Sequence, residues 1–182
     1  MYSATVKMCY IKTKLTPVDR EILGEIYHQL EQITIPTSFV NEGVQGHFHS
    51  VKTGATSQPE ARQTCFGKVH HRGRLRTSRF SLRYPFMMPL FRAFIQSHCP
   101  AFRFRSVYVN RNVACKWHLD RNAGPSLLVG FGPYTRGRTA LCVDGKPRRF
   151  HIKTHSLLFD GSKIPHCSEP FEGTRYSLVF FN

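Results

Sequence analysis

The sequence predicts a mainly β protein, a barrel or sandwich of short strands flanked by two helices. Short apolar runs follow residue 100, with turn signals such as Asp144-Gly145 and Asp160-Gly161 between them. Two longer segments before residue 100 carry apolar residues at helical spacing instead. With 182 residues, 41% of them hydrophobic, the chain can bury one core, so we expect a single domain over residues 1–182.

The first helix is expected to begin with Thr16 as N-cap and Pro17 in its first turn. Its apolar stripe recurs every three or four residues up to Pro36, at Val18, Ile22, Ile26, Leu30 and Ile33. The second helix is expected over residues 84–99, with one face formed by Leu90, Phe91, Phe94 and Ile95. Residues 1–100 would thus give helical support and a basic segment, and residues 101–182 the β core.

The strands are expected where apolar runs are bounded by turn residues. These runs cover residues 106–109, 126–131, 139–143, 150–152, 156–159 and 176–181. Because no helical segment separates them, the pattern favours a barrel or sandwich over alternating helices and strands.

The charge of the chain indicates a polyanionic partner. The formal net charge is +15, and residues 61–119 contain twelve Lys and Arg but no Asp or Glu. The densest part, residues 68–80, suits phosphate contacts, which we expect from Arg72, Arg74, Arg76 and Arg79. The alternative is a basic surface that only keeps the protein soluble. We expect nucleic acid as the partner, DNA in preference to RNA.

Other sequence features limit where the protein acts. No apolar run approaches the roughly 20 residues that a membrane-spanning helix needs. The N-terminus lacks a basic region followed by an apolar stretch, and the six Cys show no Cys-x-x-Cys spacing. We therefore expect an intracellular monomer with free thiols, nuclear if the source is a eukaryote.

His118 and Asp120, followed by His166, form the most informative group of side chains. Residues two apart on a strand point to the same side, so the His-x-Asp pair would present an imidazole and a carboxylate to one cavity. Two His and one carboxylate on one face of a metal are typical of non-haem Fe(II) oxygenases. Alone, such a pair is more often a simple hydrogen-bonded contact.

Arg175 and Ser177 strengthen the metal hypothesis. A turn-like stretch around Pro170 separates His166 from the last apolar run, so the chain reverses direction between them. Reversal brings Arg175 close to the metal ligands. Arg suits bidentate capture of a carboxylate, and Ser177 could add a hydrogen bond on the same face.

These residues carry a family resemblance. The order His118-Leu119-Asp120, His166, then Arg175-Tyr176-Ser177 resembles the 2-oxoglutarate- and Fe(II)-dependent dioxygenases. Residues 117–126, 129–137, 158–161 and 170–181 resemble its TET/JBP branch, over residues 64–182 in all. The resemblance implies a double-stranded β-helix, a jelly-roll or cupin-like barrel, that oxidises the 5-methyl group of thymine or 5-methylcytosine in nucleic acid. Arg136-Gly137-Arg138 departs from the Gly-Gly pair expected there.

The resemblance also implies roles for individual residues. Fe(II) would be held by His118, Asp120 and His166, and 2-oxoglutarate, used with O2, by Arg175 and Ser177, with Asn110 as a further contact. Asn122 is expected to touch the target base and Arg121 a phosphate. Two alternatives stay open: an oxygenase that demethylates alkylated bases in the manner of AlkB or hydroxylates protein, and a nucleic-acid-binding module without catalysis.

Overall fold

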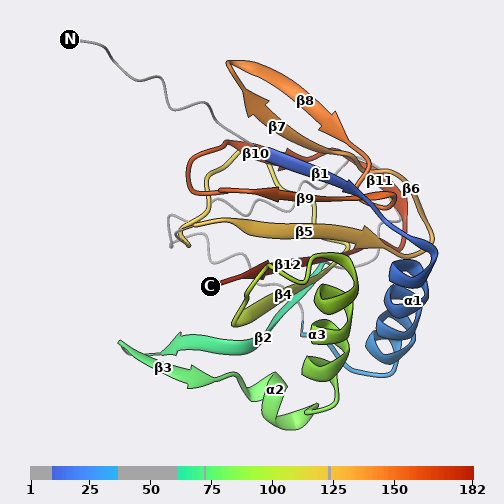
Figure 1. The fold of residues 1–182 in the computed structure, drawn as a ribbon, viewed down its shortest axis with the longest axis vertical. Coiled ribbons are helices and arrows are strands. Elements are labelled where there is room, and N and C mark those ends of the chain that lie inside the picture. Colours follow the sequence, from blue (N-terminus) through green and yellow to red (C-terminus); the bar gives the residue numbers. More distant parts are fainter. Residues whose placement is uncertain (1–9, 37–60, 72, 123) are drawn as a thin grey trace.

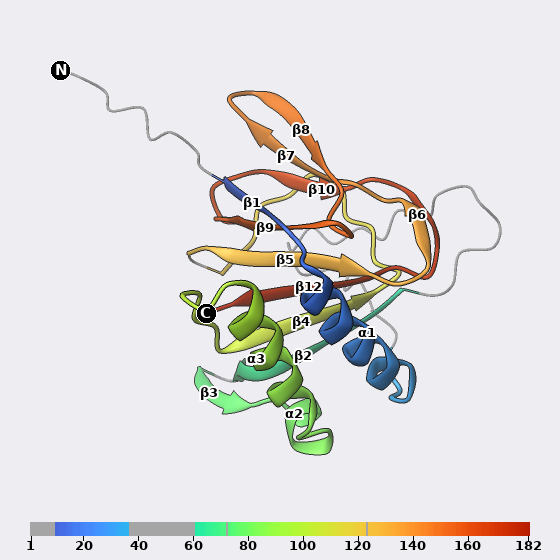
Figure 2. The ribbon, with the colours of Figure 1, turned by 45° about the vertical axis from the view of Figure 1, so that its right-hand side comes forward.

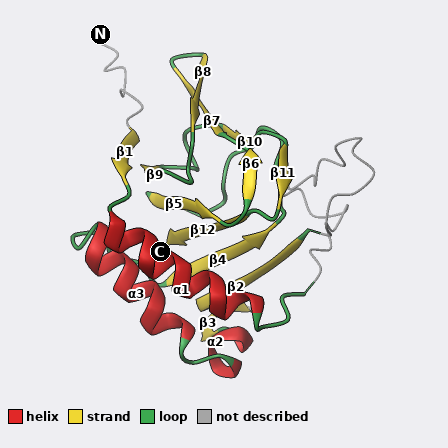
Figure 3. Ribbon diagram, turned by 90° about the vertical axis from the view of Figure 1, so that its right-hand side faces the viewer, coloured by secondary structure: helices red, strands yellow, loops and turns green. Residues whose placement is uncertain are grey.

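The computed structural model describes residues 10–36, 61–71, 73–122 and 124–182. Its main element is a seven-stranded antiparallel sheet, here called the major sheet, with helices on one face and smaller sheets on the other (Figures 1 and 3). In spatial order the major sheet contains β1 (Tyr10–Lys14), β9 (His155–Phe159), β5 (Ser126–Phe131), β12 (Tyr176–Phe181), β4 (Ser106–Arg111), β2 (Arg62–His71) and β3 (Arg74–Thr77).

Two smaller sheets complete the β structure. The three-stranded minor sheet has the order β10 (His166–Ser168), β7 (Thr139–Val143) and β8 (Lys146–Phe150). A two-stranded ribbon joins β11 (Phe171–Gly173) to β6 (Tyr134–Arg136). The predicted mainly β architecture with flanking helices is confirmed.

Helix α1 (Pro17–Glu31) begins where the sequence predicts and ends earlier. The Thr16 hydroxyl accepts from the Asp19 amide, and the Asp19 carboxylate accepts from the Thr16 amide, which makes a capping box. The helix ends at Glu31, with Gln32 as its C-cap, rather than near Pro36. Val18, predicted on the buried stripe, is 56% exposed, so that assignment was wrong.

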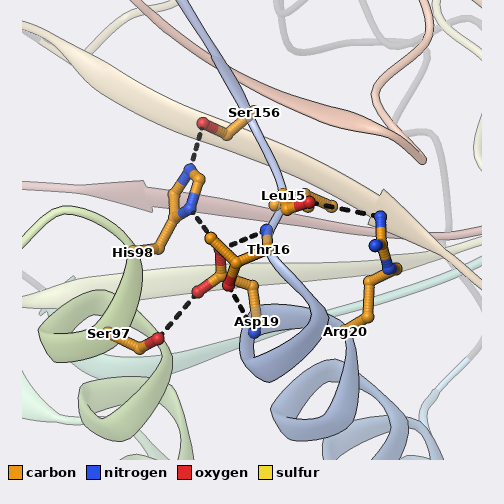
Figure 4. A network of polar contacts seen from close by, with 7 residues as sticks. All are labelled: Leu15, Thr16, Asp19, Arg20, Ser97, His98 and Ser156. Carbon is orange, nitrogen blue, oxygen red and sulfur yellow. Dashed lines mark hydrogen bonds and ion pairs between the residues drawn. The ribbon is translucent and has the colours of Figure 1, made fainter.

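Asp19 also joins the helices to the major sheet (Figure 4). Its carboxylate accepts from Ser97 Oγ at 2.8 Å and lies 2.8 Å from His98 Nδ1. His98 Nε2 lies 2.6 Å from Ser156 Oγ on β9. Burial raises the pKa of Asp19, but hydrogen bonds from Thr16, Ser97 and His98 outweigh it and hold that pKa below its ordinary value.

The second predicted helix is found as α3 (Met87–His98), preceded by the short α2 (Arg79–Arg83), which the sequence did not predict separately. α3 packs beside α1 on the major sheet (Figure 2). Its buried side chains share one apolar cluster with α1 and the central strands, and the predicted residues Phe91, Phe94 and Ile95 are among them.

The predicted strands are confirmed except for residues 150–152. There, β8 covers the polar sequence Lys146–Phe150, and the residues after it form a turn. β8 escaped prediction because its first four residues are exposed and carry no apolar alternation. The strands β1, β2 and β3 were also missed, although β1 pairs with β9 and β2 pairs with β4.

Strand β2 has two halves that meet at Gly67. Residues 62–67 pair with β4, and residues 68–71 pair with β3 to form a protruding hairpin. Gly67 has φ +90°, and a Cβ at this position would overlap the Arg105 carbonyl oxygen, so only glycine fits. Gly67 lies opposite Ser106, and Ser106 lies opposite Phe181, so the hairpin leaves the sheet at the end where β12 finishes (Figures 1 and 2).

Within the described residues, none of the helices has the length and hydrophobicity required to span a bilayer.

Candidate active site

A cavity of about 420 Å³ lies between the major and minor sheets. Side chains of β2, β4, β5 and β12 line it from the major sheet, and those of β7 and β10 from the minor sheet. The segment after β4, including His118, Asp120 and Asn122, closes one side. The cavity therefore receives residues that lie more than 100 positions apart in the sequence.

The three predicted metal ligands come together in this cavity. His118 and His166 form an isolated antiparallel bridge, in which each amide donates to the other's carbonyl at 3.0 Å. The Asp120 amide donates to the Gly161 carbonyl at 2.9 Å. As a result, Asp120 Oδ1 lies 3.6 Å from Nε2 of both histidines. The prediction of a shared face is confirmed, although a single bridge, not a regular strand, positions the pair.

Both imidazoles are oriented by backbone carbonyls. His118 Nδ1 lies 2.7 Å from the Lys116 carbonyl oxygen, and His166 Nδ1 lies 3.0 Å from that of Ile164. Nδ1 must carry the proton to donate to a carbonyl, so Nε2 keeps its lone pair for a metal. Burial lowers the pKa of His166, an effect that Asp120 opposes and His118 reinforces. The neutral form that ligates metal is therefore favoured.

Gly161 leaves the space that Asp120 needs. A Cβ at residue 161 would overlap Asp120 Oδ2 and stand 3.2 Å from His166 Cε1. The backbone of residue 161 thus supports the carboxylate closely from behind. Two oriented imidazoles and one carboxylate, with ligand atoms within 4.8 Å of one another, fit a divalent cation such as Fe(II).

Arg175 provides a buried positive charge in the same cavity. Arg175 is 2% exposed, and its Nη1 donates to the Val113 carbonyl at 3.1 Å. The ring centroids of Tyr134 and Phe171 lie within 6 Å of its guanidinium carbon. Among the described residues, none supplies a carboxylate to this guanidinium, and its Nε has no hydrogen-bond partner. Burial lowers its pKa. Burying a charge without a counter-charge costs free energy, and a bound anion would remove that cost.

A polar row crosses the major sheet beside Arg175. Ser177 on β12 lies opposite Asn110 on β4, which lies opposite Gln63 on β2. Gln63 Nε2 donates to Asn110 Oδ1 at 2.7 Å, and Asn110 Nδ2 donates to Ser177 Oγ at 3.3 Å. All three side chains line the cavity. The sequence predicted Asn110 and Ser177 but missed Gln63, because no local motif marks it.

The predicted substrate contacts divide into two groups. Asn122 and Arg121 line the cavity, and Asn122 Nδ2 donates to Ser126 Oγ at 3.0 Å. Arg74 and Arg76 on β3 and Arg79 on α2 are exposed and do not line it, while Arg72 falls outside the described residues. The basic segment is therefore a hairpin on the sheet edge and not a wall of the cavity.

Two residues close to the predicted metal ligands differ in burial. Cys115 is buried, and burial raises its thiol pKa to about 12, so it is an inert packing residue. Trp117 directly precedes His118 and is 49% exposed, so it does not pack in the core.

Comparison of the chain with known proteins identifies relatives by structure alone. The sequence matches no protein-family model, and no curated protein matches it. A 2OG-Fe(II) family oxidoreductase from Burkholderia pseudomallei superposes with a TM-score of 0.61 at 14% identity, covering 94% of this chain and 84% of that one. A Pseudomonas putida prolyl-4-hydroxylase gives 0.56 at 15% identity, with 98% and 94% covered.

NgTET1, solved in complex with 5mC DNA, gives a TM-score of 0.59 at 13% identity, covering 96% of this chain and 71% of that one. Because prolyl hydroxylases match as well as NgTET1 does, the comparison does not single out the TET/JBP branch. Identities this low establish architecture only. The chain has the double-stranded β-helix fold found among 2-oxoglutarate- and Fe(II)-dependent oxygenases.

Proposed function

We propose that this protein is an Fe(II)- and 2-oxoglutarate-dependent dioxygenase that oxidises the 5-methyl group of a pyrimidine in nucleic acid, with DNA as its substrate. One observation carries the reaction class. A metal-ligand set of two histidines and one carboxylate faces the same cavity as Arg175, a buried cation whose Nε has no partner. A dicarboxylate can bridge two such centres, with one end on the metal and the other on the guanidinium.

In this proposal each residue has one task. His118, Asp120 and His166 hold Fe(II), which with 2-oxoglutarate and O2 supplies the oxidation of a C–H bond. Arg175 and Ser177 bind and orient the distal carboxylate of the co-substrate. The apolar side chains of the cavity exclude water, and Asn122 contacts the base at the metal side.

The basic hairpin supports nucleic acid as the substrate. Lys68, Arg74 and Arg76 are exposed on β2 and β3. The hairpin leaves the major sheet at the level of Phe181, which lines the cavity, so a backbone held on the hairpin can reach the cavity. A paired base must leave its stack to enter a cavity, so the enzyme acts on a flipped or single-stranded base. A 5-methyl pyrimidine is the target that the sequence resemblance to the TET/JBP branch implies, and NgTET1, solved with 5mC DNA, shares the fold.

The decisive experiment is anaerobic reconstitution with Fe(II) and 2-oxoglutarate, then exposure to O2 with DNA and RNA containing thymine or 5-methylcytosine. Mass spectrometry of digested nucleosides should show a gain of one oxygen, and Asp120→Ala should abolish it while nucleic-acid binding persists. Formaldehyde release from N-methylated bases alone would favour the AlkB-like reaction. If succinate forms without a modified nucleoside, the proposed metal site is right and the proposed substrate is wrong. If neither product forms, the protein is a binding module.

The role of the hairpin has its own test. Arg74→Ala should weaken binding of every DNA sequence alike and reduce the slope of log affinity against log salt by about one unit. Arg92→Ala is the matched control, because Arg92 is exposed on α3 and is not part of the hairpin. If both substitutions weaken DNA binding equally, the hairpin contributes only to the net charge and makes no specific phosphate contact.

A further inference from the structure

The hydrogen bonds of the polar row have a direction. The Asn110 side chain is the middle member: its oxygen accepts from Gln63 Nε2 at 2.7 Å, so its nitrogen is the atom that faces Ser177 Oγ, at 3.3 Å. Asn110 is 9% exposed and Ser177 is 4% exposed, so little water competes for these atoms. The amide orientation at residue 110 thus depends on which atom residue 63 presents.

This direction determines what the Ser177 hydroxyl can do. Because Ser177 Oγ accepts a hydrogen bond from Asn110, its own proton remains available for another acceptor. Ser177 and Arg175 line the same cavity two residues apart. The hydroxyl proton and the partnerless Arg175 Nε–H are therefore two donors without an acceptor at one end of the cavity.

The opposite orientation would remove one of them. If the Asn110 amide were reversed, its oxygen would face Ser177 and accept a hydrogen bond from the Ser177 hydroxyl. The site would then offer Arg175 alone to a carboxylate, which has about four lone-pair positions to satisfy. In this row of described residues, Gln63 is the other neighbour of Asn110, so the atom that residue 63 presents decides between the two arrangements.

We propose that Gln63 is a positioning residue for co-substrate binding: by donating to Asn110 it makes the Ser177 hydroxyl a donor to the distal carboxylate held by Arg175. This inference rests on the proposed function, since it assumes a co-substrate with a distal carboxylate. Gln63 lies more than 40 residues before Asn110 in the chain, and it reaches the site only because β2 pairs with β4 in register.

The test measures binding instead of turnover. With Mn(II) in place of Fe(II), isothermal titration calorimetry compares 2-oxoglutarate with oxalate, which chelates the metal but has no distal carboxylate. Gln63→Leu should weaken 2-oxoglutarate about twofold to tenfold, as expected for one lost hydrogen bond, and leave oxalate unchanged. Gln96→Leu, at an exposed position on α3, is the matched control and should change neither ligand. Equal weakening of both ligands by Gln63→Leu would overturn the proposal.

A double-mutant cycle tests whether Gln63 acts through Ser177. In a Ser177→Ala background, Gln63→Leu should change the affinity for 2-oxoglutarate by less than about twofold. A full effect in that background would show that Gln63 does not act through the hydroxyl, and would also overturn the proposal. If the wild type binds neither 2-oxoglutarate nor oxalate with Mn(II), the proposed function itself fails. If it binds both, and Gln63→Leu changes neither, only the role of Gln63 fails.

Discussion

Two clusters among the described residues combine histidine with aspartate, and they differ in how many of their polar atoms have hydrogen-bond partners. In the helix cluster, the Asp19 carboxylate takes hydrogen bonds from Thr16, Ser97 and His98, and His98 reaches Ser156 with its other nitrogen (Figure 4). In the cavity cluster, Asp120 Oδ1 is 3.6 Å from both imidazoles, beyond hydrogen-bond distance. Arg175 Nε has no partner at all.

The difference separates structural from functional polar groups. A satisfied network fixes the position of the helices and has nothing left to offer a ligand. An unsatisfied one carries a cost that a bound metal or anion can remove. Residue type alone does not distinguish them, since His98 links Asp19 to Ser156 as the histidine of a hydrolytic triad links its Asp to its Ser, yet none of these three residues lines the cavity.

The largest expected effect concerns Arg175. Arg175→Met should weaken 2-oxoglutarate binding by about 30-fold or more, because truncating a buried charged partner costs about 2–5 kcal/mol. The melting temperature should change little, since the lost bond to Val113 is offset by removal of a buried charge. Calorimetry and thermal unfolding measure the two quantities. Arg111→Met is the control, because Arg111 pairs with Glu31 and does not line the cavity. A large loss of stability with unchanged binding would make Arg175 structural.

The second prediction is the reverse case, in which a substitution lowers stability and leaves ligand binding unchanged. Asp19→Ala should lower the free energy of unfolding by about 3 kcal/mol, because it breaks a buried pair with His98 and removes the capping box of α1. Metal binding by the remaining folded protein should not change. Chemical denaturation of this variant is compared with Glu25→Ala on the exposed side of α1, which should cost less than about 0.5 kcal/mol. Impaired metal binding by folded Asp19→Ala would show that the helix cluster also affects the metal site, against the distinction made above.

The third effect tests the support behind Asp120. Gly161→Ala should reduce Fe(II) or Mn(II) affinity about 10- to 100-fold, the range seen when groups behind metal ligands are changed, because the added methyl displaces the carboxylate. Gly24→Ala is the control, since a Cβ there meets nothing within 4 Å, and it should slightly stabilise α1. Unaltered metal affinity in Gly161→Ala would mean that Asp120 is not a ligand in the arrangement described.

The smallest effect is the pH dependence of the helix cluster. The pKa of Asp19 lies below its ordinary value of 3.8, so its ionised form contributes stability above that pH. This contribution is lost as the pH falls through the folded pKa. The stability difference between wild type and Asp19→Asn should therefore shrink on acidification below about pH 4, by at most about 1.4 kcal/mol per pH unit. Unfolding curves between pH 2 and pH 6 measure it, and a constant difference would contradict the assigned pKa direction.

The sequence predicted the parts of this molecule whose signals are local. The strands at residues 126–131, 139–143 and 176–181 are apolar runs between turns, and the structure reproduces their bounds. His118, Asp120 and His166 follow a recognisable spacing, and they meet in the cavity. The start of α1 was predictable because Thr16 and Pro17 are a local capping signal.

The missed parts depend on contacts between distant segments. β8 is a strand because it pairs with β7, and its exposed basic side chains give no pattern of their own. Gln63 joins the site through the register of β2 against β4, which the residues around position 63 do not reveal.

Gly67 divides β2 into a part that lines the cavity and a part that forms the hairpin, so the two parts can change separately. Side chains alternate along β2, so inserting one residue before Gly67 would move Gln63 out of the cavity and bring a neighbour in. Beyond Gly67 the strand pairs only with β3, and the length or charge of the hairpin can vary without altering that register. The hairpin can thus change in evolution or by design without moving the residues that line the cavity, which makes it the place to exchange segments if the proposed function holds and a different target is wanted.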